Sequence, residues 1–257
     1  MLWLAAIGLL LGACTSAVEV PVTSAPLRST VAVETASPTA APLAPAATDA
    51  LGQVRADFDC DGHLDLLEFF DAPRPGTYLG LHAGKLARLT RSWGAIVELA
   101  FDGMPFDEPA RNPLIGIADV NGDGCDDAIV NVGHGASTTF AAFFVFDGAR
   151  LAEVTEDGEP AVFIYEGSVR HGTGIECRTT RGAAEIVSRA VSDYTSDFDW
   201  DVVERVYRWP TLTALSLYST ATSVIRMSKA FEQPADFARY WGFTCGSLRT
   251  PGWAFTK

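Results

Sequence analysis

The chain has 257 residues, with 32 acidic and 19 basic side chains and a formal net charge of −13 at pH 7. This balance argues against nucleic acid as a partner, because binding to phosphates needs a positive surface. About two hundred residues follow a proline-rich amino-terminal segment, and that length can bury one sizeable core or two small ones.

The first thirteen residues predict a lipoprotein signal peptide. Met1 to Gly12 is almost wholly apolar and too short to cross a bilayer as a helix. The stretch Leu11-Gly12-Ala13-Cys14 matches a lipobox. The resemblance to bacterial lipoproteins implies cleavage before Cys14 and lipidation of its thiol. A diacyl group and an amide-linked chain such as palmitate would then anchor the protein at the extracytoplasmic face of the cell membrane. The alternative is a non-lipid signal peptide that leaves Cys14 free.

Residues 14–50 are expected to form a disordered linker that begins with the lipidated cysteine. Between Thr15 and Thr48 the segment is rich in Ala, Pro, Ser, Thr and Val, contains five prolines and has no aromatic residue. Such a composition cannot bury enough apolar surface to fold, and its prolines keep it extended. The linker would hold the folded part away from the membrane.

Two short aspartate-rich loops are the most informative feature of the chain. The first loop spans residues 57–65 and the second loop residues 119–127, and both follow the pattern D-x-[DN]-x-D-G-x-x-D. Side-chain oxygens at loop positions one, three, five and nine, with a backbone carbonyl at position seven, can surround one hard cation. Calcium fits, because it takes six to eight oxygen ligands with loose geometry. The glycine at position six permits the sharp turn.

The pattern therefore predicts two structural calcium sites. The ligands of the first would be Asp57, Asp59, Asp61, Asp65 and the carbonyl of His63, with Glu68 at position twelve as a further candidate. The ligands of the second would be Asp119, Asn121, Asp123, Asp127 and the carbonyl of Cys125.

The flanks of both loops predict strands rather than the helices of an EF-hand. Pro73 and Pro75 follow the first loop closely, and Pro113 lies shortly before the second. The run from Ala128 to Val132 is rich in β-branched residues, which are typical of strands. An EF-hand, and an acidic solvated turn without an ion, are the two alternatives.

The loops lie inside a longer repeat of acidic loop, strand, connection, strand and turn. A third, weaker unit lacks the loop, because in the stretch that starts at Asp197 a valine replaces the glycine and Arg205 stands at position nine. We expect a hairpin tip at residues 197–201. Strands are expected at 66–70 and 77–82 with a turn at 83–86, at 128–132 and 140–146 with a turn at 147–151, and at 185–187 and 203–209.

The two loops, each followed by an apolar strand, resemble FG-GAP or VCBS-type repeats, the β-hairpin units of integrin-like propellers and of many bacterial surface proteins. The stretch from Gly133 to Cys177 is similar to actinobacterial FG-GAP lipoproteins. The resemblance implies a mainly β fold, with calcium-binding repeats in residues 51–155 and a β-rich C-terminal half, 156–257, packed on the same domain. A closed propeller needs at least four blades, so two good units and one poor unit favour a partial propeller or a compact β-rich domain.

Apart from Cys14, four cysteines remain, and in an exported domain they predict two disulfides. Three connectivities are possible. Cys60 and Cys125 both lie inside aspartate loops, which adjacent hairpins would bring together, so we favour Cys60–Cys125 and Cys177–Cys245. No C-x-x-C motif is present, which leaves a thioredoxin-like redox role unsupported.

Motifs of common enzymes are missing, since the chain has no G-x-S-x-G, H-E-x-x-H, Walker or G-x-G-x-x-G pattern. We therefore expect no catalytic residue and favour a non-enzymatic, calcium-stabilised lipoprotein that binds an unidentified envelope protein or glycan. The aromatic pairs at Trp241–Phe243 and Trp253–Phe255 are candidates for an exposed binding face. The alternative is a lipid-anchored extracytoplasmic hydrolase with an unidentified site in its C-terminal half.

Overall fold

The structure, a computed structural model, describes residues 50–72, 83–103, 112–194, 196, 198–226, 234–246 and 248–250. Contacts divide the chain into two units, 1–37 and 38–257, and all described residues lie in the second. The predicted signal peptide, Cys14, the linker up to residue 49, the strand predicted at 77–82 and the Trp253–Phe255 pair lie outside the described residues. No helix in the described part is long and apolar enough to cross a membrane.

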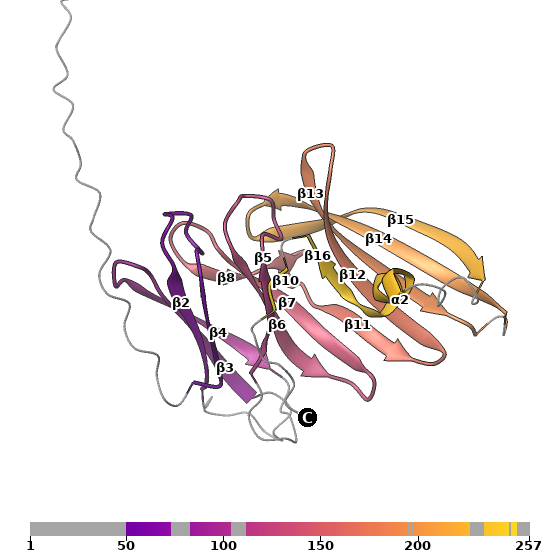
Figure 1. Cartoon of the computed structure of the whole chain (residues 1–257), viewed down its shortest axis with the longest axis horizontal. Coiled ribbons are helices and arrows are strands. Elements are labelled where there is room, and N and C mark those ends of the chain that lie inside the picture. The colour runs from indigo at the N-terminus through magenta and orange to yellow at the C-terminus, as the bar shows by residue number, and fades with distance from the viewer. Residues whose placement is uncertain are drawn as a thin grey trace, which may run out of the picture. The chain divides into compact units, whose positions relative to one another are not determined.

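A four-stranded antiparallel sheet, sheet A, comes first in the chain, and its strands pair in chain order (Figure 1). The turn predicted at 83–86 is wrong, because the third strand already begins there. Lys85 pairs with Asp71 on one side and with Phe101 on the other. Ala87 and Leu89 are buried in alternation, so one strand pattern runs through the whole segment. The strands of sheet A are β1 (Gly52–Ala56), β2 (Asp65–Asp71), β3 (Ala83–Thr90) and β4 (Ile96–Gly103).

A twelve-stranded mixed sheet, sheet B, contains the remaining strands, and neither sheet closes into a barrel. Along its main path the order is β10-β9-β15-β14-β13-β12-β11-β7-β6-β5, while β8 pairs with β7 and β16 pairs with β12. The strands are β5 (Leu114–Ala118), β6 (Asp127–His134), β7 (Thr138–Phe146), β8 (Leu151–Glu153), β9 (Thr155–Glu156), β10 (Glu159–Pro160), β11 (Phe163–Ser168), β12 (His171–Thr180), β13 (Ala183–Ser192), β14 (Asp199–Thr211), β15 (Ala214–Arg226) and β16 (Phe243–Cys245).

Three runs of strands pair in chain order. They are β1–β4 in sheet A and β5–β8 in sheet B, each of four strands, and β11–β15 in sheet B, which has five strands, so only the first two runs have four. The mainly β fold is therefore confirmed, and the strands predicted at 128–132, 140–146, 185–187 and 203–209 lie within β6, β7, β13 and β14. Sheet B continues across the predicted boundary between residues 155 and 156, because β7 pairs with β11.

Strands β6 and β7 are buried on both faces, which explains their almost continuous apolar sequence. On one face Ala142 and Phe144 belong to the core cluster that joins sheet B to sheet A, where Phe144 meets Phe101 with ring centroids 4.9 Å apart. On the other face Ile129 and Phe143 pack into a second cluster with residues of β12 to β15. These strands therefore form the central layer of the fold.

One helix, α2 (Pro234–Trp241), covers β12 and was not predicted from the sequence. A Cβ atom at Gly174 would lie 2.1 Å from the carbonyl oxygen of Arg239, so only glycine permits this close approach. Trp241 is buried and packs edge-on against the fully buried Trp200. The prediction that Trp241 belongs to an exposed binding face is therefore wrong.

Buried ion pairs cross the middle of β12 to β14. The carboxylate of Glu185 accepts hydrogen bonds from Arg178, Arg208 and Thr180. Burial alone would raise the pKa of Glu185, but these three donors outweigh it and hold its pKa below the usual range. Arg189 similarly lies between Glu176 and Glu204. The network satisfies charges that the sheet removes from water.

We predict that Glu185→Gln lowers the free energy of unfolding by about 2 kcal/mol at neutral pH, because it removes charged hydrogen bonds. The folded-state pKa of Glu185 lies below its unfolded value of 4.5. Its contribution is therefore fully present above pH 4.5 and is lost as the pH falls through the folded-state pKa. Urea denaturation at several pH values measures this. Glu159→Gln, on the exposed strand β10, is the matched control. A deficit that persists unchanged in acid would contradict the assignment.

Candidate metal centre

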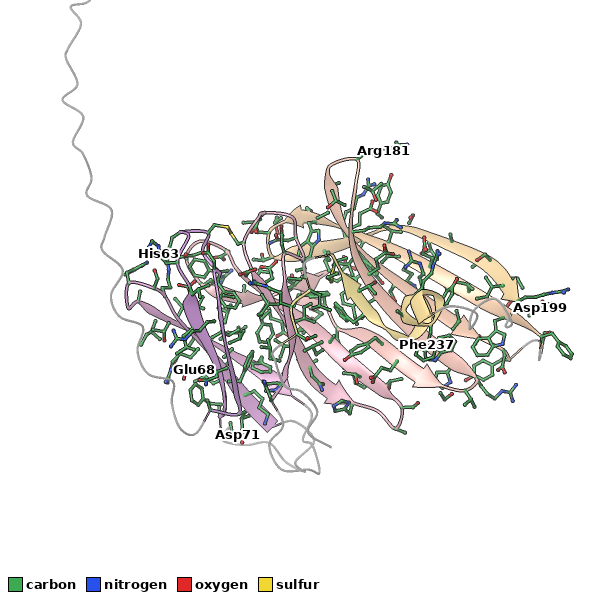
Figure 2. The ribbon with its side chains drawn as sticks, in the orientation of Figure 1. His63, Glu68, Asp71, Arg181, Asp199 and Phe237 are labelled. Carbon is green, nitrogen blue, oxygen red and sulfur yellow. A yellow bond between two sulfur atoms is a disulfide. The ribbon has the colours of Figure 1, made fainter. Side chains whose placement is uncertain are left out.

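Both aspartate loops connect two antiparallel strands. The first joins β1 to β2, with Ala56 paired to Asp65, and the second joins β5 to β6, with Ala118 paired to Asp127. The EF-hand alternative is therefore wrong, because strands and not helices flank each loop. In Figure 2 the label His63 marks the position of the first loop.

The two loops share one hydrogen-bond pattern, position by position. The carboxylate at position one accepts the N–H of the glycine at position six, at 3.0 Å in the first loop and 3.1 Å in the second. The oxygen at position three accepts the N–H of position five, and position five accepts that of position seven. Both glycines have positive φ angles, +84° and +92°. The donors are Gly62, Asp61 and His63 in the first loop and Gly124, Asp123 and Cys125 in the second.

The aspartate at position nine ties each loop to the core. Asp65 and Asp127 are buried, and each accepts the backbone N–H of position two, at 3.1 and 3.0 Å. The side chains at position two, Phe58 and Val120, are buried as well. Each loop is therefore held by its own closing carboxylate and by an apolar side chain beneath it.

The first three acidic positions of the first loop converge. Asp57, Asp59 and Asp61 each offer a carboxylate oxygen, and these oxygens lie within 4.8 Å of one another. A carboxylate oxygen that accepts one N–H keeps a lone pair for a cation. The donor set thus fits a hard cation such as calcium, which prefers oxygen ligands.

The second loop offers a weaker charge cluster. Asn121 replaces the aspartate at position three, and its Nδ2 donates to Asp123 Oδ2 at 3.1 Å. Among the described residues its carboxylates do not form a group of three as compact as that of the first loop. A cation there would rely on Asp119, Asp123 and the neutral oxygen of Asn121.

The turn between β3 and β4 closes over the first loop, which the sequence reasoning missed. The guanidinium of Arg91 pairs with Asp59, with Nε 2.6 Å from Oδ2. Ser92 donates its hydroxyl to Asp61 at 2.8 Å and its backbone N–H to Asp65 at 2.7 Å. Arg91 therefore offsets part of the negative charge and competes with a cation for one oxygen of Asp59.

The carboxylates at position nine, Asp65 and Asp127, have raised pKa values. Burial raises the pKa of Asp65 to about 6, and the nearby charges of Asp59 and Asp61 add to the rise against hydrogen bonds from Ser92 and Phe58. Burial, together with the charges of Asp123 and Asp119, also raises the pKa of Asp127 well above its usual value. A cation in either loop would relieve this repulsion.

Covalent and hydrogen bonds join the two loops to each other. The predicted disulfide Cys60–Cys125 is confirmed, with Cα atoms 5.1 Å apart. The N–H of Asp126 donates to the carbonyl of Asp57 at 2.9 Å, and the N–H of Asp57 donates to Asp126 Oδ2 at 2.9 Å. The second predicted disulfide, Cys177–Cys245, is also confirmed and joins the paired strands β12 and β16.

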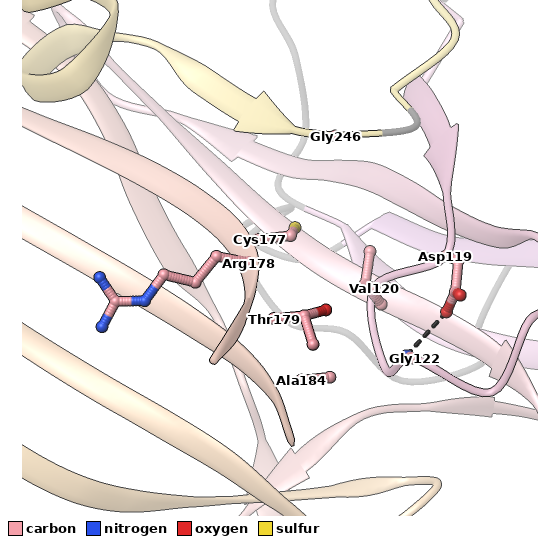
Figure 3. Close-up of a pocket in the computed structure, with 8 residues that line it drawn as sticks. All are labelled: Asp119, Val120, Gly122, Cys177, Arg178, Thr179, Ala184 and Gly246. Carbon is pink, nitrogen blue, oxygen red and sulfur yellow. Dashed lines mark hydrogen bonds between the residues drawn. The ribbon is translucent and has the colours of Figure 1, made fainter. Parts of the chain in front are cut away.

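The remaining predicted residues lie around these loops. Glu68 lies on β2 and is not part of the acidic cluster; Figure 2 shows it well away from His63. A cavity of about 320 Å³ adjoins the second loop, lined by Asp119 and Gly122 and, across from them, Thr179 and Ala184 (Figure 3).

Comparisons of the chain with models of known protein families, with curated proteins and with solved structures find no match. Function must therefore be inferred from the loops and their surroundings.

We predict that Cys60→Ser/Cys125→Ser lowers the free energy of unfolding by about 2–4 kcal/mol, because it frees the two loops in the unfolded chain. Amide hydrogen exchange should become faster in both loops at once. In the matched Cys177→Ser/Cys245→Ser variant the faster exchange should instead appear at β16. If only one loop lost its protection from amide hydrogen exchange, the inference that the disulfide holds both loops together would be contradicted.

Proposed function

We propose that this chain is an exported, lipid-anchored binding protein of the cell envelope whose two aspartate loops hold structural calcium ions. The observation that carries the proposal is the repetition of one hydrogen-bond pattern in two loops of the same sequence pattern. The three carboxylates that converge in the first loop add to this support, because they form an oxygen donor set of the kind that calcium prefers.

Calcium would act on the fold rather than on a substrate. Asp57, Asp59 and Asp61 would bind it in the first loop, and Asp119, Asn121 and Asp123 in the second. The ion supplies positive charge that offsets the crowded carboxylates. The loops lie on buried side chains and join the two sheets, so a bound ion would stabilise that junction.

FG-GAP-like repeats are supported by the order of the strands. In β1–β4 and again in β5–β8, an aspartate loop joins the first two strands of a four-stranded meander, which is the strand number of a propeller blade. The third meander, β11–β15, has five strands and no aspartate loop between its first two. We propose two calcium-binding units and one derived unit, in an arrangement that does not close.

Export and anchoring are supported by cysteine chemistry. Both disulfides would persist in an oxidising compartment and would be unusual in the cytosol. The LGAC stretch before the linker supplies the means of anchoring. The partner we propose is an envelope protein or a glycan.

The hydrolase alternative has less support. Ser168 Oγ lies 2.9 Å from His171 Nδ1, but the two residues are three apart in one tight turn, and Tyr194 contacts the same nitrogen. A nucleophile is activated when a third group orients the base from its other side. We therefore favour the binding role.

We predict that calcium raises the melting temperature and that a chelator lowers it, because the ion binds only the folded state. A hundredfold excess over the dissociation constant stabilises by about 2.7 kcal/mol. Asp61→Asn and Asp123→Asn should each abolish one binding event in a calorimetric titration. Asp157→Asn, in an exposed turn outside the loops, is the matched control.

The Arg91→Gln variant tests whether Asp59 can bind a cation or serves only in its ion pair with Arg91. It should tighten calcium binding at the first loop, because it frees Asp59, and it should lower stability in chelator. If calorimetry detects no calcium binding and chelator leaves melting unchanged, the proposal fails.

We predict that Cys14→Ser prevents lipidation, so that the protein is released from the membrane or remains unprocessed. Membrane fractionation and the mass of the mature chain measure this, with Ser16→Ala as a neighbouring control. Unchanged fractionation and mass in the Cys14 variant would refute the anchor.

A further inference from the structure

The outer edge of β15 is open over most of its length. On one side the strand pairs with β14 through Arg226, but on the other it pairs with β9 only at Ala214 and Leu215. Among the described residues nothing else pairs with that edge, and Ser216 to Val224 are all exposed. The opposite end of sheet B is treated differently, because Arg249 forms a two-way backbone bridge with Ile117 of β5.

Apart from Arg226 at its end, the sequence of β15 has none of the usual protection of an edge strand. Proteins guard exposed edges with charged side chains or prolines. From Ala214 to Ile225 this strand contains neither a charged residue nor a proline, although the whole chain carries a net charge of −13. Leu217 and Val224 are 50% and 62% exposed. The edge is therefore an uncharged strip on an acidic protein, so a second copy that pairs with it brings no like charges together within the strip.

The strand is also self-complementary. Ser219-Thr220-Ala221-Thr222-Ser223 reads the same in both directions. Two antiparallel copies related by a two-fold axis at Ala221 would place Thr220 opposite Thr222 and Ser219 opposite Ser223. Cross-strand threonine and serine pairs of this kind stabilise sheets.

A β-bulge in β15 extends the pairing of similar side chains beyond the palindromic stretch Ser219–Ser223. The register with β14 shifts between Val206 and Tyr207, where Tyr218 is an extra residue in β15. The shift places Leu217 on the same face as Thr220, Thr222 and Val224. In the two-fold arrangement Leu217 of one copy would then lie opposite Val224 of the other, which pairs the two exposed aliphatic side chains.

We propose that two copies of this chain associate through β15, edge to edge and antiparallel, with a two-fold axis at Ala221 that makes sheet B continuous across the dimer. The occupant of the edge is a second copy, because an isologous contact needs a self-complementary surface and β15 provides one in both sequence and register. This inference does not depend on calcium binding.

Paired charge variants test the register. In Thr220→Lys/Thr222→Lys, lysines would face each other twice across the axis, and in Thr220→Glu/Thr222→Glu, glutamates would do so. Each variant alone should weaken the dimer by at least about tenfold. An equimolar mixture should recover it through lysine–glutamate pairs. These residues are exposed, so the fold should be unaffected, and Ala136→Lys/Ser137→Lys adds the same charge in the exposed β6–β7 turn, away from the edge.

The measurement is the mass of the full chain in detergent by analytical ultracentrifugation, with disulfide cross-linking of Ala221→Cys as a second readout. We expect a wild-type dimer, monomeric charge variants, a mixed dimer, and cross-linked Ala221→Cys but not Ser137→Cys in the exposed β6–β7 turn. A monomeric wild type overturns the proposal. So does the finding that the edge of β15 binds extended peptides of other proteins but not a second copy of the chain. A dimer that both charge variants leave intact overturns it equally.

Discussion

The junction between the two aspartate loops is the constraint on which the packing of sheet A against sheet B depends. Each loop begins at the end of one hairpin strand and closes on a buried carboxylate, so the position of the loop fixes the position of its hairpin. The disulfide, one backbone hydrogen bond and one hydrogen bond from the N–H of Asp57 to the Asp126 carboxylate then hold one loop to the other. The apolar cluster between β2 and β7 lies between the same two hairpins that the loops join. The contacts between the acidic loops at the surface and the packing of the core thus connect the same two hairpins.

The junction brings many carboxylates close together, and nearby side chains offset part of their negative charge. Arg91 reaches the first loop from a turn that is distant in sequence, while Arg249 pairs with Asp126 beside the second. Asn121 lowers the charge of the second loop directly. In the middle of sheet B, arginines flank Glu185, so the buried carboxylate there is fully paired. Burial raises the pKa values of Asp65 and Asp127, the neighbouring aspartates add to the rise, and a divalent cation in each loop would oppose it.

Local patterns were predictable from the sequence, and contacts between distant segments were not. The loops, β6 and β7 follow from spacing and from β-branched runs, and the Cys60–Cys125 pairing follows from two cysteines in equivalent loops. The start of β3 was misplaced because a glycine and a lysine are typical of turns, yet here the ladder with β2 decides. Helix α2 is short and contains three aromatic residues, and its stability comes from packing on Gly172 and Gly174 rather than from its own sequence. Nothing near the first loop in sequence indicates Arg91 and Ser92, because they reach it only through the fold.

The two ends of sheet B show how differently one sheet can treat its edges. At β5 the edge is occupied at Ile117 by backbone from the C-terminal segment. At β15 the outward-facing backbone groups beyond Leu215 have no partner strand among the described residues, and the side chains up to Ile225 carry no charge that would keep another strand away. Several strands lie between these edges along the path of the sheet, so changes at the loops and changes at β15 share no contacting residues. Their effects on the free energy of unfolding should therefore add. Since a protein that had to remain monomeric would gain from a single lysine on β15, the absence of any charge from Ala214 to Ile225 is best explained by a strand that is paired when the protein functions.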